Sequence, residues 1–113
     1  MSTILTWLGH GCWAIEIEGT KLLLDPFLDD SPTAPVKADQ VEAEYILASH
    51  GHFDHVTDLP RIAMRCNSTV IASFEVCQWA KAQGVAEDKL QEMNIGGEIK
   101  LPFGQVKMTI AQH

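Results

Sequence analysis

Four residues within a stretch of six carry the side chains that bind divalent metals in proteins. They are His50, His52, Asp54 and His55, in the run His-Gly-His-Phe-Asp-His. Imidazole nitrogens and carboxylate oxygens coordinate metals such as zinc at about 2.0–2.2 Å. The residue types and their spacing therefore predict a metal site, and such a site can activate a water molecule for hydrolysis.

An apolar run precedes this motif and is expected to present it. Residues 45–48, Tyr-Ile-Leu-Ala, indicate a buried strand, which places the motif on a loop at the strand's carboxyl end. Extended backbone sends residues i and i+2 to the same side, so His50 and His52 could share one ion. Asp54 and His55 lie further along and could reach a second ion about 3.5–4 Å away. The alternatives are a solvent-exposed loop rich in histidine and a helix capped by Asp54.

Length, charge and composition narrow the class of protein. The 113 residues suffice for one domain, residues 1–113, and the chain is 46% hydrophobic and 20% charged, as in globular proteins. A net charge of −7 with scattered Lys and Arg disfavours nucleic acid as a partner. No apolar run is long enough for a transmembrane helix, and residues 1–9 lack the basic region of a signal peptide. We therefore expect a small-molecule substrate and no membrane partner.

The three cysteines indicate a reducing compartment. Cys12, Cys66 and Cys77 are odd in number and show no C-x-x-C spacing, which argues against a disulfide framework. We expect them to be small buried hydrophobic residues in a cytoplasmic protein.

The order of predicted elements favours an α+β fold. Thr57 or Asp58 is expected to cap one helix and Ser73 a second, while residues 26–40 form a long loop. Residues 86–92 are expected to add a helical turn. The predicted strands cover residues 3–8, 12–18, 21–25, 44–48, 69–72, 98–101 and 105–111, and the helices residues 58–66 and 74–83. This order predicts a mixed, mostly antiparallel sheet with helices on one face.

Further segments give the chain a family resemblance. An H-x-H-x-D-H motif after an apolar strand resembles the signature of the metallo-β-lactamase superfamily. The segments Thr-Trp-Leu-Gly-His (6–10), Leu-Asp-Pro-Phe (24–27), Ser-His-Gly-His (49–52) and Met-Asn-Ile-Gly-Gly (93–97) resemble its bacterial metal-dependent hydrolases, which are relatives of the L-ascorbate-6-phosphate lactonases. The resemblance runs from Thr3 to His113. It implies the αβ/βα sandwich of that superfamily, with this chain similar to its first half.

The resemblance also implies a ligand set. His50, His52 and His113 would hold one metal, and Asp54 and His55 would contribute to a second. The family takes a bridging Asp and a final His from its second half, and no residue here can replace them. We therefore expect this chain to be part of an enzyme and to lack turnover alone.

Three other residues are expected near the site. Asp25, in the Leu-Asp-Pro-Phe segment, resembles the family's carboxylate that supports the metal loop; the alternative is a strand-end Asp that accepts local N–H groups. His10 resembles a histidine near the active site of relatives, with a turn residue of no special role as the alternative. Phe53 stands where the family usually has Gly, which is expected to alter the rim of the site.

Taken together, the motif and the resemblance predict a metal-dependent hydrolase. The substrate would be an ester, a lactone or a phosphoester, and Asp54 would bind metal and orient the attacking water. One or two divalent ions are expected, with zinc favoured over Mn, Fe or Ni. The alternative is a non-catalytic metal-binding fragment, or a subunit that needs a partner half. The uncovered sheet face of a half sandwich favours a homo-oligomer.

Overall fold

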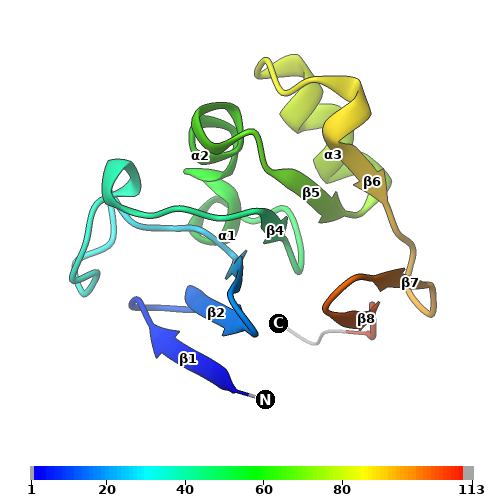
Figure 1. Cartoon of the computed structure of the whole chain (residues 1–113). Helices are drawn as coiled ribbons and strands as arrows, with labels where there is room; N and C mark the ends of the chain where they lie inside the picture. Colours follow the sequence, from blue (N-terminus) through cyan, green and yellow to red (C-terminus); the bar gives the residue numbers. More distant parts are fainter. Residues whose placement is uncertain (1, 111–113) are drawn as a thin grey trace.

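A six-stranded sheet carries the fold, and a separate two-stranded hairpin lies beside it (Figure 1). The computed structural model describes residues 2–110. The sheet contains, in spatial order, β1 (Thr3–Trp7), β2 (Trp13–Ile17), β3 (Thr20–Leu24), β4 (Tyr45–Leu47), β5 (Thr69–Ala72) and β6 (Leu90–Glu92). The hairpin is β7 (Glu98–Leu101) and β8 (Gly104–Lys107), and the helices are α1 (Phe53–Val56), α2 (Leu59–Cys66) and α3 (Phe74–Ala82), with 3-10 turns at Ala38–Gln40 and Glu87–Lys89.

The sheet is mixed, as predicted, but its antiparallel part is limited to β1, β2 and β3. The pairs β3–β4, β4–β5 and β5–β6 are parallel. Parallel neighbours need a crossover connection. Helices α1 and α2 connect β4 to β5, and α3 lies in the connection from β5 to β6. The carboxyl ends of β3, β4 and β5 therefore lie along one edge of the sheet, the edge at which these strands end. The residues that follow the three strands meet there.

The helices cover one face of the sheet, as predicted from the order of the elements. Leu23, Ile46 and Val70 project from the three central strands into a core that is completed by helical residues. Those helical residues are Val56 of α1, Leu59, Ile62 and Ala63 of α2, and Val76, Cys77 and Ala80 of α3. Ser73 caps α3 as expected, since its hydroxyl accepts a hydrogen bond from the Val76 N–H.

Besides β8, which ends at Lys107 and does not extend over the expected residues 105–111, two elements differ from the sequence prediction. The loop expected over residues 50–55 turns into the short helix α1 at Phe53, with His52 as its extended N-cap residue. Asp54 then lies in the first helical turn, where a negative charge is favourable. The second difference is β6: residues 90–92 pair with β5, so the helical turn expected over residues 86–92 is confined to Glu87–Lys89.

The expectation that Asp58 caps α2 through its side chain is wrong. Asp58 does occupy the N-cap position, but its side chain makes no capping hydrogen bond. It is fully buried, and its Oδ2 accepts the N–H groups of Leu28 and Asp29 at 2.6 and 3.1 Å. These two hydrogen bonds attach the start of the 26–40 loop, which follows β3, to the N-terminus of α2.

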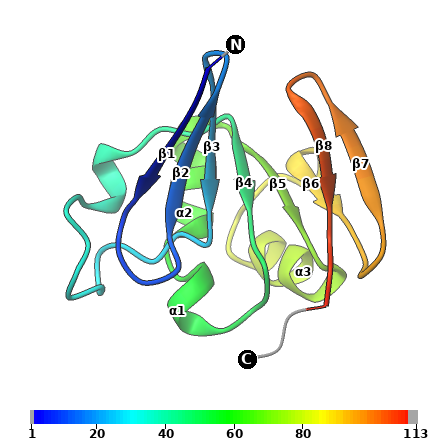
Figure 2. The same cartoon turned by 90° about the horizontal axis from the view of Figure 1, so that it is seen from below.

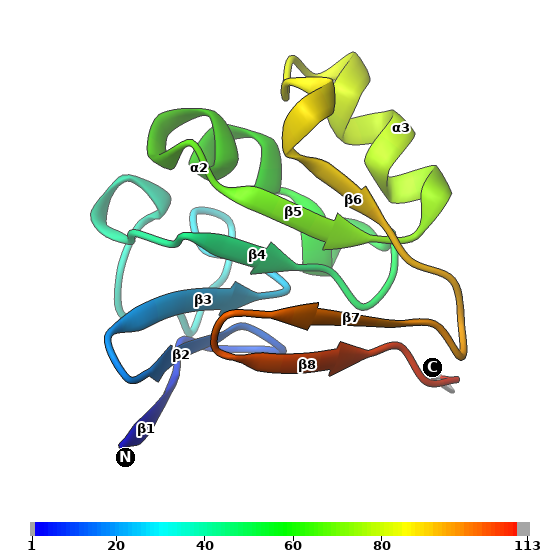
Figure 3. The same cartoon turned by 45° about the vertical axis from the view of Figure 1, so that its right-hand side comes forward.

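The hairpin covers part of the sheet face that lies opposite the helices (Figure 3). The ring of Phe103 packs edge-on against Tyr45 of β4, with 5.1 Å between the ring centroids. Farther along this sheet, β1 and β2 leave large apolar side chains exposed, namely Ile4, Leu5, Trp7 and Trp13. Trp7 and Trp13 are therefore surface residues and not part of the hydrophobic core.

Two of the cysteines are buried in the core, and all three are free thiols. Burial is the main cause that raises the pKa of Cys12 and of Cys77 to about 11. Neither thiol has the low pKa of a reactive nucleophile. Within residues 2–110, no helix has the length and the apolar character needed to cross a membrane.

Candidate metal centre

The candidate site lies at the edge where β3, β4 and β5 end (Figure 2). In that view α1, the start of α3 and the end of β8 all lie at this edge, although they are distant in sequence. Asp25 follows β3, the residues from Ser49 to His52 follow β4, and Asp54 and His55 lie on α1. Parallel strands thus gather at one place the polar residues that the sequence distributes over three segments.

Asp25 joins the end of β3 to the end of β4 and to α1 through three hydrogen bonds. It is only 4% exposed and has a left-handed backbone, with φ of 49°. Its Oδ1 accepts the Ser49 N–H at 2.6 Å, and its Oδ2 accepts the Ser49 hydroxyl at 2.5 Å and His55 Nδ1 at 2.9 Å. The contacts match the expected support for the motif loop, rather than the alternative of a local backbone bond alone.

This network also sets the orientation of two histidine rings. Asp25 Oδ2 lies 2.9 Å from His55 Nδ1, a contact that suits a ring with its proton on Nδ1, and in the neutral form of such a ring Nε2 offers a lone pair. Ser49 donates to Asp25, so its oxygen can accept from His50 Nδ1 at 2.8 Å. Carboxylate and hydroxyl partners of this kind hold histidine ligands in the tautomer that binds metal.

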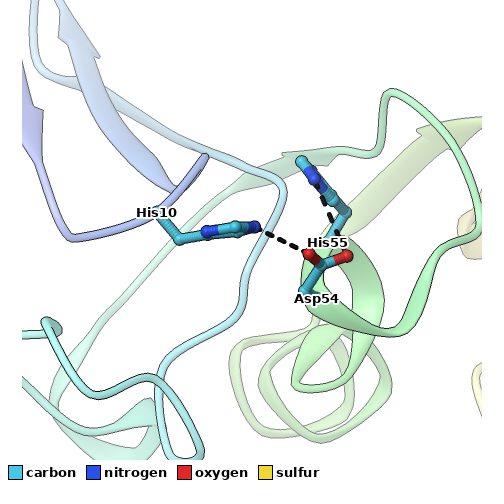
Figure 4. A group of neighbouring side chains, drawn as sticks. All are labelled: His10, Asp54 and His55. Carbon is cyan, nitrogen blue, oxygen red and sulfur yellow. Dashed lines mark hydrogen bonds and ion pairs between the residues drawn. The ribbon is translucent and has the colours of Figure 1, made fainter. Parts of the chain in front are cut away.

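His10 approaches the same place from the turn between β1 and β2 (Figure 4). Its Nε2 lies 2.8 Å from Asp54 Oδ2, and His55 Nε2 lies 3.8 Å from Asp54 Oδ1. Partial desolvation raises the pKa of Asp54, but the hydrogen bond from His10 and the nearby His55 outweigh it and hold the pKa below its usual value. Asp54 is therefore a carboxylate near neutral pH, the form that binds a metal.

The turn that carries His10 fits closely against the site. His10 has a left-handed backbone, with φ of 51°, and its carbonyl accepts a 2.9 Å hydrogen bond from the Trp7 indole. A Cβ on Gly11 would lie 2.8 Å from Cε1 of His55, closer than real Cβ contacts. Only glycine therefore lets this turn approach the His55 ring without displacing it.

The ligand atoms converge in two overlapping groups. One atom from each of His10, Asp54 and His55 lies within 4.8 Å of the others, and the same holds for Asp25, His50 and His55. The ring centroid of His50 lies 4.7 Å from that of His52 and 4.2 Å from that of His55. Nitrogen and carboxylate donors at this density fit a divalent metal such as zinc.

The structure brings together most of the residues that the sequence singled out. His50, His52, Asp54 and His55 lie at one edge with His10 and Asp25, while His113 lies outside the described residues. Phe53 is 62% exposed and packs against Phe27, whose ring also contacts His10. The roles of Ser49 and Gly11 were missed, because each depends on a contact with a residue from another segment.

Comparison with known proteins places the chain in a family. The model of a beta-lactamase superfamily domain matches residues 4–110. A UPF0173 metal-dependent hydrolase of Carboxydothermus hydrogenoformans is 46% identical over 111 residues, and one of Heliobacterium modesticaldum is 43% identical over 109. Each alignment covers 96% of this chain but only 47% and 44% of the relative, so the chain spans about half the length of the curated relatives it matches.

A solved structure shows the same arrangement. Igni18, a metallo hydrolase from the archaeon Ignicoccus hospitalis, superposes with a TM-score of 0.71 and 25% sequence identity. The match covers 88% of this chain and 43% of Igni18. From its sequence, its sheet and the residues gathered at the sheet edge, the chain belongs to the metallo-β-lactamase superfamily.

Proposed function

We propose that this chain supplies a divalent-metal site for the hydrolysis of a small ester, lactone or phosphoester. The observation that carries the proposal is the convergence of potential ligand atoms in two groups that share His55, one with His10 and Asp54 and the other with Asp25 and His50, at one sheet edge. The metal-dependent hydrolases similar to this chain support the same chemistry.

In this proposal His50, His52, Asp54 and His55 hold one or two divalent ions, and His113 joins His50 and His52. A bound divalent ion supplies a Lewis acid and lowers the pKa of water, so that hydrolysis proceeds near neutral pH. Asp25 orients the His55 ring through its own hydrogen bond to Nδ1 and the His50 ring through the Ser49 hydroxyl, which would leave the two Nε2 atoms for the metal. Zinc suits this donor set best, and Mn, Fe and Ni remain candidates that elemental analysis would distinguish.

Asp54 and His10 act together on the attacking water in this scheme. Asp54 is ionised and one of its oxygens is held by His10, so the carboxylate has a fixed direction. A carboxylate held in this way can orient a water molecule and accept its proton. His10 is thus a positioning residue for Asp54.

The test of this function is metal removal and restoration in the protein at its full natural length. Dialysis against a chelator should abolish hydrolysis of 4-nitrophenyl esters, and added Zn or Mn should restore it. His52→Ala should lose most of the bound metal and at least the bulk of turnover, because a site that loses one ligand holds its ion poorly. Full metal content with unchanged turnover in His52→Ala would refute the assignment.

The second candidate is a metal-binding chain without activity of its own, and the coverage of only 44–47% of the relatives favours it. The 113-residue chain would then bind metal but hydrolyse nothing unless a second half is present. Assays of this chain beside the full-length protein, under the same metal conditions, distinguish the two candidates.

We further propose that the 113-residue chain self-associates in the cytoplasm, where its free thiols remain reduced. The exposed side chains of Leu5, Trp7 and Trp13 on β1 and β2 form an apolar surface that favours contact with another copy. Light scattering should report a dimer or larger species, and Trp7→Lys should shift it toward the monomer. A monodisperse monomer of the unaltered chain would contradict this expectation.

A further inference from the structure

A pocket of about 510 Å³ opens directly beside His50. Its walls come from the β4 end, the first turns of α3, the turn after β6 and the residues that follow β8. Most of its lining is apolar and consists of Val56, Val76, Trp79, Ile95 and Met108. Trp79 is 36% exposed and Ile95 63% exposed, so both present surface that a ligand can cover.

The charge of the pocket selects against anions. Among residues 2–110, Glu75 is the one acidic side chain of the lining, and neither Lys nor Arg belongs to it. The other polar groups are the uncharged hydroxyls of Ser49, Ser73 and Thr109 and the His50 ring. Apart from an ion held at His50, a phosphate placed here would find no cation among the described lining residues to offset the Glu75 carboxylate, whereas a neutral apolar group would gain contact with the walls.

The first turn of α3 is the feature that could favour an anion, because helix N-termini present free N–H groups. Two features of this turn weaken its ability to bind an anion. The Ser73 hydroxyl already accepts the Val76 N–H at 3.4 Å, and Glu75 adds a carboxylate to the same turn. The charges and hydrogen-bond donors at this end of the pocket therefore favour a neutral ligand over an anion.

We infer that this pocket binds the apolar substituent of a neutral ester or lactone, with the scissile carbonyl placed toward His50. The inference rests on the proposed function and narrows its substrate class, since it excludes substrates that carry a phosphate group in this position. Trp79 is then a specificity-determining residue, and Glu75 is the group that rejects anions.

The test compares two matched substitutions on α3 in the full-length, metal-loaded protein. Trp79→Ala removes an aromatic wall of the pocket, whereas Phe74→Ala removes an exposed aromatic ring that does not line it. For 4-nitrophenyl butyrate, Trp79→Ala should raise KM by about tenfold, and Phe74→Ala should leave KM within about twofold. Equilibrium dialysis with 2-methoxynaphthalene, a neutral ligand that cannot be hydrolysed, should show the same contrast in Kd.

A charge exchange gives a second, independent measurement. For mono-4-nitrophenyl succinate, whose acyl chain would carry a carboxylate into the pocket, Glu75→Lys should raise the ratio of its kcat/KM to that of 4-nitrophenyl butyrate by about tenfold, and Glu75→Gln should raise this ratio less. Equal effects of Trp79→Ala and Phe74→Ala, or a wild-type preference for the succinate ester over the butyrate ester, would overturn the inference. Metal content measured on the same samples separates the two proposals: a protein that binds 2-methoxynaphthalene through Trp79 but holds no metal would refute the function and keep the pocket.

Discussion

Replacing Asp25 with alanine should cost the protein both stability and metal. Asp25 is almost fully buried and accepts hydrogen bonds from the Ser49 N–H, the Ser49 hydroxyl and His55 Nδ1. Removal of the carboxylate leaves these donors without their acceptor, which should lower the free energy of unfolding by about 3 kcal/mol. The rings of His50 and His55 also lose their fixed orientation, so metal affinity should fall by about 10- to 100-fold.

Urea unfolding and zinc titration against a competing chelator measure the two effects separately. Asp25→Asn keeps one acceptor oxygen, so it should unfold more easily than wild type but less easily than Asp25→Ala, with metal affinity still reduced. Asp39→Asn, at an exposed position in the 26–40 loop, controls for the loss of one negative charge. Wild-type metal affinity in Asp25→Ala would show that the network does not position the ligands.

Gly11→Ala should weaken metal binding although it alters none of the proposed ligands. The new Cβ would lie 2.8 Å from Cε1 of His55, so the ring must move away from its hydrogen bond to Asp25. We expect a decrease in metal affinity of at least about tenfold, in the range seen when the partners of metal ligands are disturbed.

Gly19→Ala provides the matched control for this substitution. Gly19 lies in the turn between β2 and β3, where an added Cβ meets nothing within 4 Å, but its φ of 87° makes alanine unfavourable. Gly19→Ala should therefore reduce stability by about 1 kcal/mol and leave metal affinity unchanged. Equal metal affinities in the Gly11 and Gly19 variants would mean that the turn does not constrain His55.

Much of the fold could be predicted from local sequence, because the signals are local. The alternation in β2, the apolar run of β4 and the Ser73 cap of α3 each depend on a few neighbouring residues. The strand β6 could not be found in this way, since its three residues are held by parallel pairing to β5, twenty positions earlier in the register. Asp58 was misjudged for a related reason: its hydrogen-bond partners, Leu28 and Asp29, lie thirty residues away.

In the candidate site too, some residues could be identified from the local sequence and others only from contacts between distant segments. His50, His52, Asp54 and His55 were evident because one short segment contains them all. Ser49 links Asp25 to His50, and Gly11 makes room for His55, yet neither residue type indicates a role until the segments are placed in space. The motif therefore identifies the proposed metal ligands, but the residues that position them are found only from contacts between segments.

Anomalous diffraction from crystals of the metal-loaded, full-length protein tests the central claim most directly. Data collected above and below the zinc absorption edge identify bound zinc, because its anomalous signal is strong above the edge and weak below it. The expected result is one or two peaks at the sheet edge, within coordination distance of His50, His52, Asp54 or His55. A peak bound elsewhere, or no peak near these residues at the absorption edge of any metal that elemental analysis finds in the active protein, would contradict the assignment of these residues as the metal site.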